Sequence, residues 1–136
     1  LTKKEELTSM KRLRKRPKEM MTRIFGGDLM SLDKKKCLPC SGEVPAMNMQ
    51  QIKPLLIQLD NQWNLVGEHH LEREFLFEDF VSALDFVNAA GDICEQENHH
   101  ADFHLSWGKV KVSIWTHKIN GLAEADFILA AKIEKI

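Results

Sequence analysis

The sequence predicts an α+β domain, built as a four-stranded antiparallel sheet with three helices packed on one face. From residue 48 onward, helical and alternating patterns follow each other in the order helix, two strands, helix, two strands, helix. Both strand pairs are joined by short turns, which favour antiparallel neighbours and place the helices together on one side of the sheet. The chain has 136 residues, of which 43% are hydrophobic, and this is enough for one domain with a packed core.

The first predicted helix follows Asn48, which is a suitable N-cap. Its apolar residues recur at helical spacing: Met49, Ile52, Leu56 and Leu59. Pro54 interrupts this pattern, because a proline in the middle of a helix costs about 3 kcal/mol. The sequence therefore leaves two alternatives open, a helix from residue 48 or a shorter one that begins near Pro54.

Two stretches show the alternation of half-buried strands. Residues 63–77 predict a strand pair, with Leu71, Phe75 and Phe77 on one face and Glu72 and Glu74 on the other. Residues 103–107 and 109–117 predict a second pair joined at Gly108. In its second strand Val110, Val112, Ile114 and Thr116 alternate with Lys109, Lys111, Ser113, Trp115 and His117. The alternation predicts one buried and one open face.

Two further helices complete the pattern. Asp79 can cap the first of them. The apolar stripe predicted for that helix consists of Phe80, Ala83, Leu84, Val87 and Ala90. The last helix corresponds to "LAEADFILAAKIEKI", residues 122–136.

Charge is unevenly distributed along the chain. Residues 1–36 hold 12 Lys/Arg and 5 Asp/Glu, a net charge of +7, whereas residues 37–136 hold 7 and 15, a net charge of −8. We expect residues 1–36 to be a basic, disordered extension and residues 37–136 to be the folded domain. The motif "KRLRKRPK" fits a nuclear signal, the remnant of an organelle presequence or a solvated tail, which is our default. Glu5, Glu6 and Glu19 argue against a transit peptide, because such peptides contain few acidic residues.

These charges also restrict the partners and the compartment. The acidic domain argues against direct binding of nucleic acid. No apolar run approaches the ~20 residues that a membrane span requires, so we expect no membrane association. We expect an intracellular protein, in the cytoplasm, or in the mitochondrion, plastid or nucleus if the basic arm is a targeting signal.

The three cysteines, an odd number, fit no disulfide framework and favour a reducing environment. Cys37 and Cys40 in "CLPC" form half of a zinc site, with no second pair downstream. A thioredoxin-like redox motif would need a βαβ frame, which is missing here. We interpret both as ordinary thiols in a loop and Cys94 as a packing residue. A small zinc protein that uses the CLPC pair and histidines is the weakest alternative.

Three histidines in "ENHHADFHLSWGKVKVSIWTH", residues 97–117, are the candidate chemical groups. His99 and His100 lie where a helix gives way to a strand, and His117 ends an adjacent strand, so all three can meet at one rim of the sheet. Glu95 lies one turn before His99 and can orient its ring, and Asp126 opens the last helix nearby. Imidazoles held by carboxylates suit general acid–base catalysis near neutral pH.

One alternative accompanies this prediction. The same histidines could form a hydrogen-bonded cluster at an element junction, without chemistry. His69 and His70 are expected to point to opposite faces of a strand and to be surface residues.

Four features of residues 63–133 resemble the pterin-4a-carbinolamine dehydratase family: "EQENHH", Trp107, Thr116-His117 and "GLAEADFILA". The spacing from Glu95 to Asp126 matches the family signature. Two positions depart from it. Ala101 stands where proline, cysteine or serine usually follows the histidine pair, and Ala123 replaces the usual Thr/Ser cap of the last helix.

The resemblance implies an enzyme that dehydrates 4a-hydroxytetrahydrobiopterin to the quinonoid dihydropterin and water, and so recycles the tetrahydropterin cofactor of an aromatic-amino-acid hydroxylase. It implies no metal and no cofactor. By the same resemblance His99, His100, His117, Glu95 and Asp126 form the catalytic set, and His100, Trp107 and Asp102 bind the substrate. Within that set, the first and third histidines form the acid–base pair, the second holds the pterin and the two carboxylates orient the rings. It also implies a homotetramer built as a dimer of dimers. A non-catalytic dimerisation cofactor or assembly factor with the same fold, bound to a protein partner, is the alternative.

Overall fold

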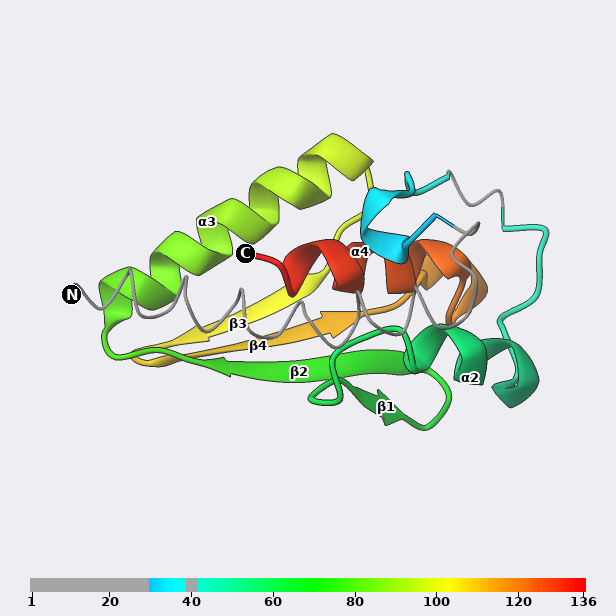
Figure 1. Ribbon diagram of the computed structural model, residues 1–136, viewed down its shortest axis with the longest axis horizontal. Helices are drawn as coiled ribbons and strands as arrows, with labels where there is room; N and C mark the ends of the chain where they lie inside the picture. The colour runs from blue at the N-terminus through cyan, green and yellow to red at the C-terminus, as the bar shows by residue number, and fades with distance from the viewer. Residues whose placement is uncertain (1–29, 39–41) are drawn as a thin grey trace.

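The computed structural model of the chain describes residues 30–38 and 42–136. In chain order its elements are the 3-10 helix η1 (Leu32–Lys34), α2 (Met49–Leu56), β1 (Asn64–Val66), β2 (His70–Leu76), α3 (Phe80–Glu97), β3 (Asp102–Ser106), β4 (Lys109–Ile114), the 3-10 helix η2 (His117–Ile119) and α4 (Glu124–Ile133). The strands form one antiparallel sheet in the order β1-β2-β4-β3, with α3 and α4 over the same face (Figure 1). The predicted fold class is confirmed. Within the described residues, no helix is long and apolar enough to cross a membrane.

The central strand β4 shows the predicted alternation. Val110, Val112 and Ile114 are fully buried, whereas the residues between them are partly exposed. The turn from β3 to β4 requires glycine at position 108, because a Cβ there would lie 2.9 Å from the carbonyl oxygen of Phe77. That close approach allows the Phe77 N–H to donate to the Gly108 oxygen at 2.8 Å. The hairpin is thereby joined to the end of β2.

Helix α3 begins where the sequence predicts. Two residues of the predicted stripe, Ala83 and Ala90, are buried, but the buried face is rotated relative to that stripe. The Asp79 side chain accepts from the Ser82 N–H at 2.8 Å. The buried residues are Ala83, Phe86, Ala90 and Cys94. Phe80 and Leu84, which were predicted to belong to the stripe, are 43% and 38% exposed. The reason is aromatic packing: the Phe86 ring lies 4.5 Å from that of Phe75 and 5.2 Å from that of Phe77, and this contact fixes the helix rotation.

Helix α2 begins at Met49, so the alternative of a later start near Pro54 is wrong. Asn48 and Gln51 form a capping box, in which each side chain accepts from the backbone N–H of the other residue. Pro54 lies inside the helix but is exposed, so water can satisfy the carbonyl that loses its partner. Ile52 is fully buried and anchors the helix to the core.

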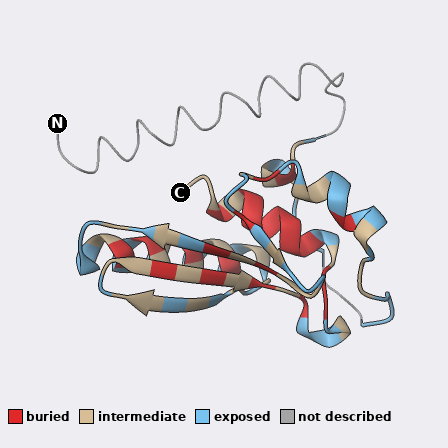
Figure 2. Ribbon diagram, turned by 90° about the horizontal axis from the view of Figure 1, so that it is seen from below, coloured by how far each residue is buried: buried red, intermediate tan, exposed pale blue. Residues whose placement is uncertain are grey.

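Helix α4 is buried over almost its whole length (Figure 2), and the segment around η1 packs on its outer side. Leu32 is only 3% exposed and belongs to the core. Lys132 donates to the Asp33 carbonyl oxygen at 2.8 Å, and Lys135 bonds to the Asp33 carboxylate. Burial alone would raise the pKa of that carboxyl, but hydrogen bonds from Lys135 and Ser31 hold the pKa below its usual value. Residues 30–36 therefore belong to the packed body, and the predicted boundary at residue 36 is too late. Residues 1–29 lie outside the described part.

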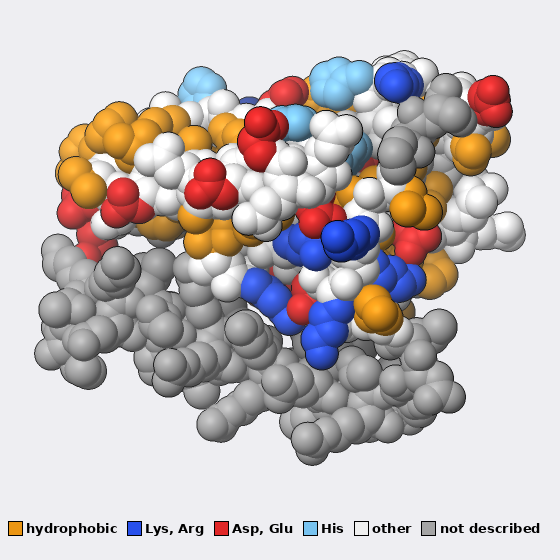
Figure 3. Space-filling model, turned by 90° about the horizontal axis from the view of Figure 1, so that it is seen from above, with side chains coloured by type: hydrophobic (Ala, Val, Ile, Leu, Met, Phe, Trp, Pro, Cys, Tyr) orange, Lys and Arg blue, Asp and Glu red, His pale blue; other side chains and the backbone are white. Residues whose placement is uncertain are grey.

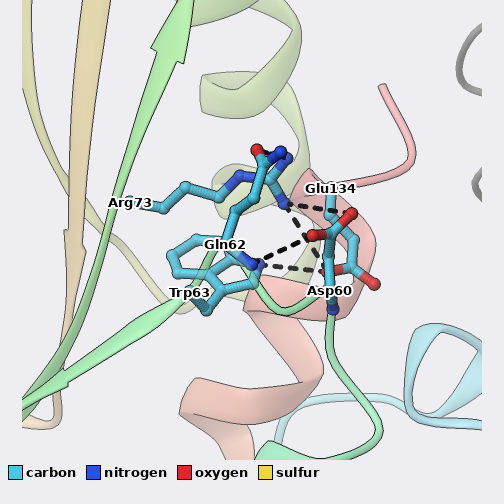
Figure 4. A network of polar contacts seen from close by, with 5 residues as sticks. All are labelled: Asp60, Gln62, Trp63, Arg73 and Glu134. Atoms are coloured by element: carbon cyan, nitrogen blue, oxygen red, sulfur yellow. Dashed lines mark hydrogen bonds and ion pairs between the residues drawn. The ribbon is translucent and has the colours of Figure 1, made fainter.

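A buried arginine connects β2 to the end of α4 (Figure 4). Arg73 is 1% exposed and donates to Gln62 Oε1 at 2.9 Å. Its guanidinium lies 3.9 Å from carboxylate oxygens of both Asp60 and Glu134. Glu134 also accepts from Trp63 Nε1 at 3.0 Å and from the Asp60 N–H at 2.9 Å. The buried charges are thus paired, which is the condition under which burial of charge is tolerated.

Candidate active site

The end of α3 determines where the histidine pair points. Asn98 adopts φ +50° in the left-handed region and ends the helix, and the His99 N–H then donates to the Cys94 carbonyl at 3.1 Å. Asparagine tolerates this conformation better than most residues. The reversal turns His99 toward α4, while His100 follows on the exposed side.

His99, Asp126 and Thr116 form a hydrogen-bonded group at the junction of α3, β4 and α4. His99 Nε2 lies 2.6 Å from Asp126 Oδ1, and the Thr116 hydroxyl and the Ala123 N–H each donate to Asp126 Oδ2 at 2.8 Å. The Asp126 side chain is fully buried, whereas that of His99 remains 17% exposed. Because an ionised carboxylate only accepts, His99 must carry a proton on Nε2, and Nδ1 of the neutral ring is left as the free base.

His100 pairs with Glu95 on the surface. Its Nε2 bonds to Glu95 Oε2, and the two side chains are 55% and 78% exposed. Glu95 was predicted to orient His99, and this is wrong, because it bonds to His100. The left-handed turn at Asn98 carries His99 away from the face of α3 on which Glu95 stands and leaves His100 above it.

His117 comes directly after Thr116 and begins η2, the 3-10 helix that follows β4. It is exposed, and its ring stacks on that of Trp115, with centroids 4.3 Å apart. Among the described residues, no hydrogen bond or ring contact joins His117 to His99 or His100. Thr116 connects His117 to the His99 group. It precedes His117 in the chain, and its hydroxyl donates to Asp126, which binds His99.

The two remaining residues of the predicted site lie at opposite ends of the β3–β4 hairpin. Asp102 is exposed and begins β3, two residues after His100. Trp107 lies in the turn that follows β3 and is 69% exposed. A five-residue strand at ~3.3 Å per residue separates this turn from the histidine end. Within one chain Trp107 therefore lies at the far end of β3 from His100, although the resemblance groups the two as substrate-binding residues.

Three further residues lie beside His117 and were not predicted to belong to the site: His69, His70 and Trp115. His69 and His70 do not point to opposite faces: their Nδ1 atoms are 3.0 Å apart, because His69 belongs to the turn before β2 and strand alternation does not apply to it. Their ring centroids lie 5.3 and 5.6 Å from that of Trp115, on which His117 stacks. These contacts with Trp115 could have been predicted only from the register of β2 against β4, and we could not derive that register from the sequence.

Neither described thiol forms a hydrogen bond with a histidine side chain. Cys37 donates to the Ala125 carbonyl at 3.4 Å, and burial together with the nearby Glu97 carboxylate raises the pKa of the Cys37 thiol to about 12. Cys94 is 1% exposed, as expected for a packing residue, and burial raises its pKa too. Cys40 lies outside the described residues. In residues 30–38 and 42–136, no three His, Cys, Asp or Glu side chains are grouped so that they could hold a metal ion.

The fold and the rim together define a small α+β protein with two histidine–carboxylate pairs where α3 ends. The chain belongs to the pterin 4 alpha carbinolamine dehydratase family, whose profile matches residues 45–136.

Relatives and a solved structure agree with this assignment. A protein of Alkaliphilus metalliredigens named for the same family is 49% identical over 105 residues, which cover 77% of this chain and 95% of the relative. A protein of Rickettsia canadensis, named likewise, is 52% identical over 103 residues, which cover 76% and 94%. The crystal structure of a transcriptional coactivator/pterin dehydratase from Brucella melitensis matches with a TM-score of 0.60 and 29% identity, over 65% of this chain and 94% of that one.

Proposed function

We propose that the protein dehydrates a 4a-hydroxytetrahydropterin to the quinonoid dihydropterin and water. The observation that carries this proposal is the buried Asp126 carboxylate, which accepts three hydrogen bonds and holds one edge of His99. A carboxylate so placed fixes the tautomer of an imidazole and stabilises the imidazolium that forms when the ring accepts a proton. Membership of the family supplies the substrate class.

In the proposed reaction the C4a–O bond breaks, N5 loses its proton and a C4a=N5 double bond forms. His99 Nδ1 accepts the N5 proton, and Asp126 stabilises the resulting cation. His117 protonates the departing hydroxyl, which leaves as water. His100, whose Nε2 donates to Glu95, accepts from an N–H on the polar edge of the pterin through Nδ1. The nitrogen lone pair drives the expulsion, so the reaction needs no metal or redox cofactor.

The test is an assay of the purified protein with freshly generated 4a-hydroxytetrahydropterin. His99→Ala and His117→Ala should each lower kcat by about 10²-fold or more, the usual scale of one acid–base group. His100→Ala should mainly raise KM, because loss of a contact common to substrate and transition state weakens binding alone. His104→Ala, an exposed histidine on β3, is the matched control and should behave as wild type. Exhaustive chelation should leave turnover unchanged. A wild-type protein that does not exceed the uncatalysed rate would refute the proposal.

A second candidate role, in protein association, rests on an apolar patch. Hydrophobic side chains gather at the end of the molecule where α3 begins (Figure 3). The exposed large hydrophobic residues of this end are Leu76, Phe80, Val81, Leu84 and Trp107. We propose that copies of this chain associate through the patch, in keeping with the expected tetramer. Val81→Glu should reduce the mass measured by light scattering. An unchanged mass would refute this role for the patch.

A further inference from the structure

Three rings beside His117 have no part in the reaction proposed above: His69 and His70 from the β1–β2 turn and the start of β2, and Trp115 after β4. His69 packs at 5.3 Å from Trp115, and Trp115 stacks on His117 at 4.3 Å. Only one ring therefore separates His69 from a group to which we assign proton transfer.

A second path of contacts connects His69 to His117 through Asn120. His69 Nε2 lies 2.9 Å from Asn120 Oδ1. Asn120 closes η2 in the left-handed region, with φ +49°, and its N–H donates to the His117 carbonyl at 3.2 Å. His69 thus contacts both the ring on which His117 stacks and the residue that ends its helix.

We propose that His69 is a positioning residue for His117, a role that rests on the proposed function. Helix η2 has only three residues, so it contains few internal hydrogen bonds to hold an exposed side chain. The position of His117 then depends on Trp115, on which its ring stacks, and on Asn120, which binds its carbonyl oxygen, and His69 contacts both.

The contact with His70 indicates which nitrogen of His69 donates and which accepts. The Nδ1 atoms of His69 and His70 are 3.0 Å apart, so one of them must donate and the other accept. If Asn120 Oδ1 accepts from His69 Nε2, a neutral His69 has its lone pair on Nδ1 and accepts from His70. A single orientation of the His69 ring satisfies both contacts. His70 therefore keeps His69 aimed at Asn120.

Substitutions of His69 can separate its two contacts. His69→Phe keeps a ring against Trp115 and loses both hydrogen bonds, whereas His69→Gln keeps an amide that can donate to Asn120 and loses the ring. His69→Ala loses both, and its kcat should fall about 10-fold with KM unchanged, a loss within the range expected from a misplaced catalytic group. Each of the other two variants should recover part of this loss. His104→Ala again serves as the matched control.

Two further measurements test whether His69 acts through His117. In a His117→Ala background, His69→Ala should lower kcat no further, because residues that act as one unit are not additive. In the free protein, the NMR signal of the His117 Cε1 proton should be displaced by the Trp115 ring current. His69→Ala and Asn120→Gly should both move that signal toward its value in an unfolded chain. Glycine is chosen at position 120 because it adopts the positive φ without strain.

The outcomes are distinguishable. An unchanged His117 signal in folded His69→Ala and Asn120→Gly would overturn the positioning role, and so would a loss of kcat that adds fully to that of His117→Ala. A wild-type protein without dehydratase activity would refute the proposed function instead. In that event the NMR measurement, which needs no substrate, still decides whether His69 positions His117.

Discussion

Asp126→Asn tests the central feature of the site with almost no change in shape. In the native protein Asp126 Oδ2 accepts from the Thr116 hydroxyl and the Ala123 N–H, both at 2.8 Å, and Oδ1 faces His99 Nε2 at 2.6 Å. An asparagine must keep its oxygen toward the two donors. Its NH₂ group then faces His99 and requires a lone pair on Nε2. The His99 proton moves to Nδ1, the atom that we assign as the base.

The size of the effect follows from this tautomer change. Removing one acid–base group costs about 10²–10⁴-fold in rate. The equivalent Asp→Asn change in a Ser-His-Asp triad, where the tautomer is also reversed, costs about 10⁴-fold in kcat. We therefore expect kcat of Asp126→Asn to fall by about 10²–10⁴-fold. The free energy of unfolding should change by only ~1 kcal/mol, because two of three hydrogen bonds persist and the third is replaced.

The assay compares kcat on 4a-hydroxytetrahydropterin with the unfolding transition measured by circular dichroism. Glu95→Gln is the matched control, because it removes a carboxylate from the exposed His100 pair while keeping the buried one, and it should cost less than about 10-fold. A folded Asp126→Asn protein whose kcat stays within about threefold of wild type would refute the assignment of His99 Nδ1 as the base. A reversed His99 tautomer could not support that rate.

Four further predictions concern stability. Leu32→Ala should lower the free energy of unfolding by about 2–4 kcal/mol in a denaturant titration, because Leu32 is 3% exposed in the core; no change would mean that η1 does not pack. Arg73→Met should cost about 3–5 kcal/mol by leaving buried carboxylates uncompensated, and adding Glu134→Gln should restore part of that loss. Ala123→Ser should raise the free energy of unfolding by about 1 kcal/mol by supplying the missing N-cap oxygen of α4. The Cys37 thiol has a pKa raised from 9.0 to about 12, so its contribution is complete below pH 9 and is lost as the pH rises toward 12; Cys37→Ala should lose stability less steeply over that range.

The inward-facing side chains of β4 could be predicted because one face of the sheet is buried. The period of two in β4 specifies which side chains enter the core, and Val110, Val112 and Ile114 do so. The rotation of α3 could not be predicted in this way. Phe80 and Leu84 are as apolar and as well spaced as Phe86, and only the aromatic partners across the sheet select Phe86. Helix η1 gave no signal at all, since a three-residue helix with one apolar residue has no period.

The location of the candidate site could be predicted from the sequence, but the hydrogen-bond partners within it could not. The order of the elements brings the end of α3, the end of β4 and the start of α4 together, and this is why His99 and Asp126 could be placed at one rim. The partner of Glu95 depends on the left-handed conformation of Asn98. If the helix continued past residue 97, Glu95 would face His99, and this is why His99 was predicted in place of His100. The contact of His69 with Trp115 depends on strand register.

Asp126 connects stability to chemistry in this chain. The N-cap of α4 is Ala123, which has no side-chain acceptor, so Asp126 Oδ2 alone takes the Ala123 N–H and completes the start of the helix. The same carboxylate orients His99 through its other oxygen. An alanine at position 126 would therefore destabilise the helix start and release the histidine together, and the two effects could not be separated. Asparagine retains the helix contact and reverses only the histidine contact. Because of this division between the two oxygens, a loss of activity in folded Asp126→Asn reports on His99 and not on the fold.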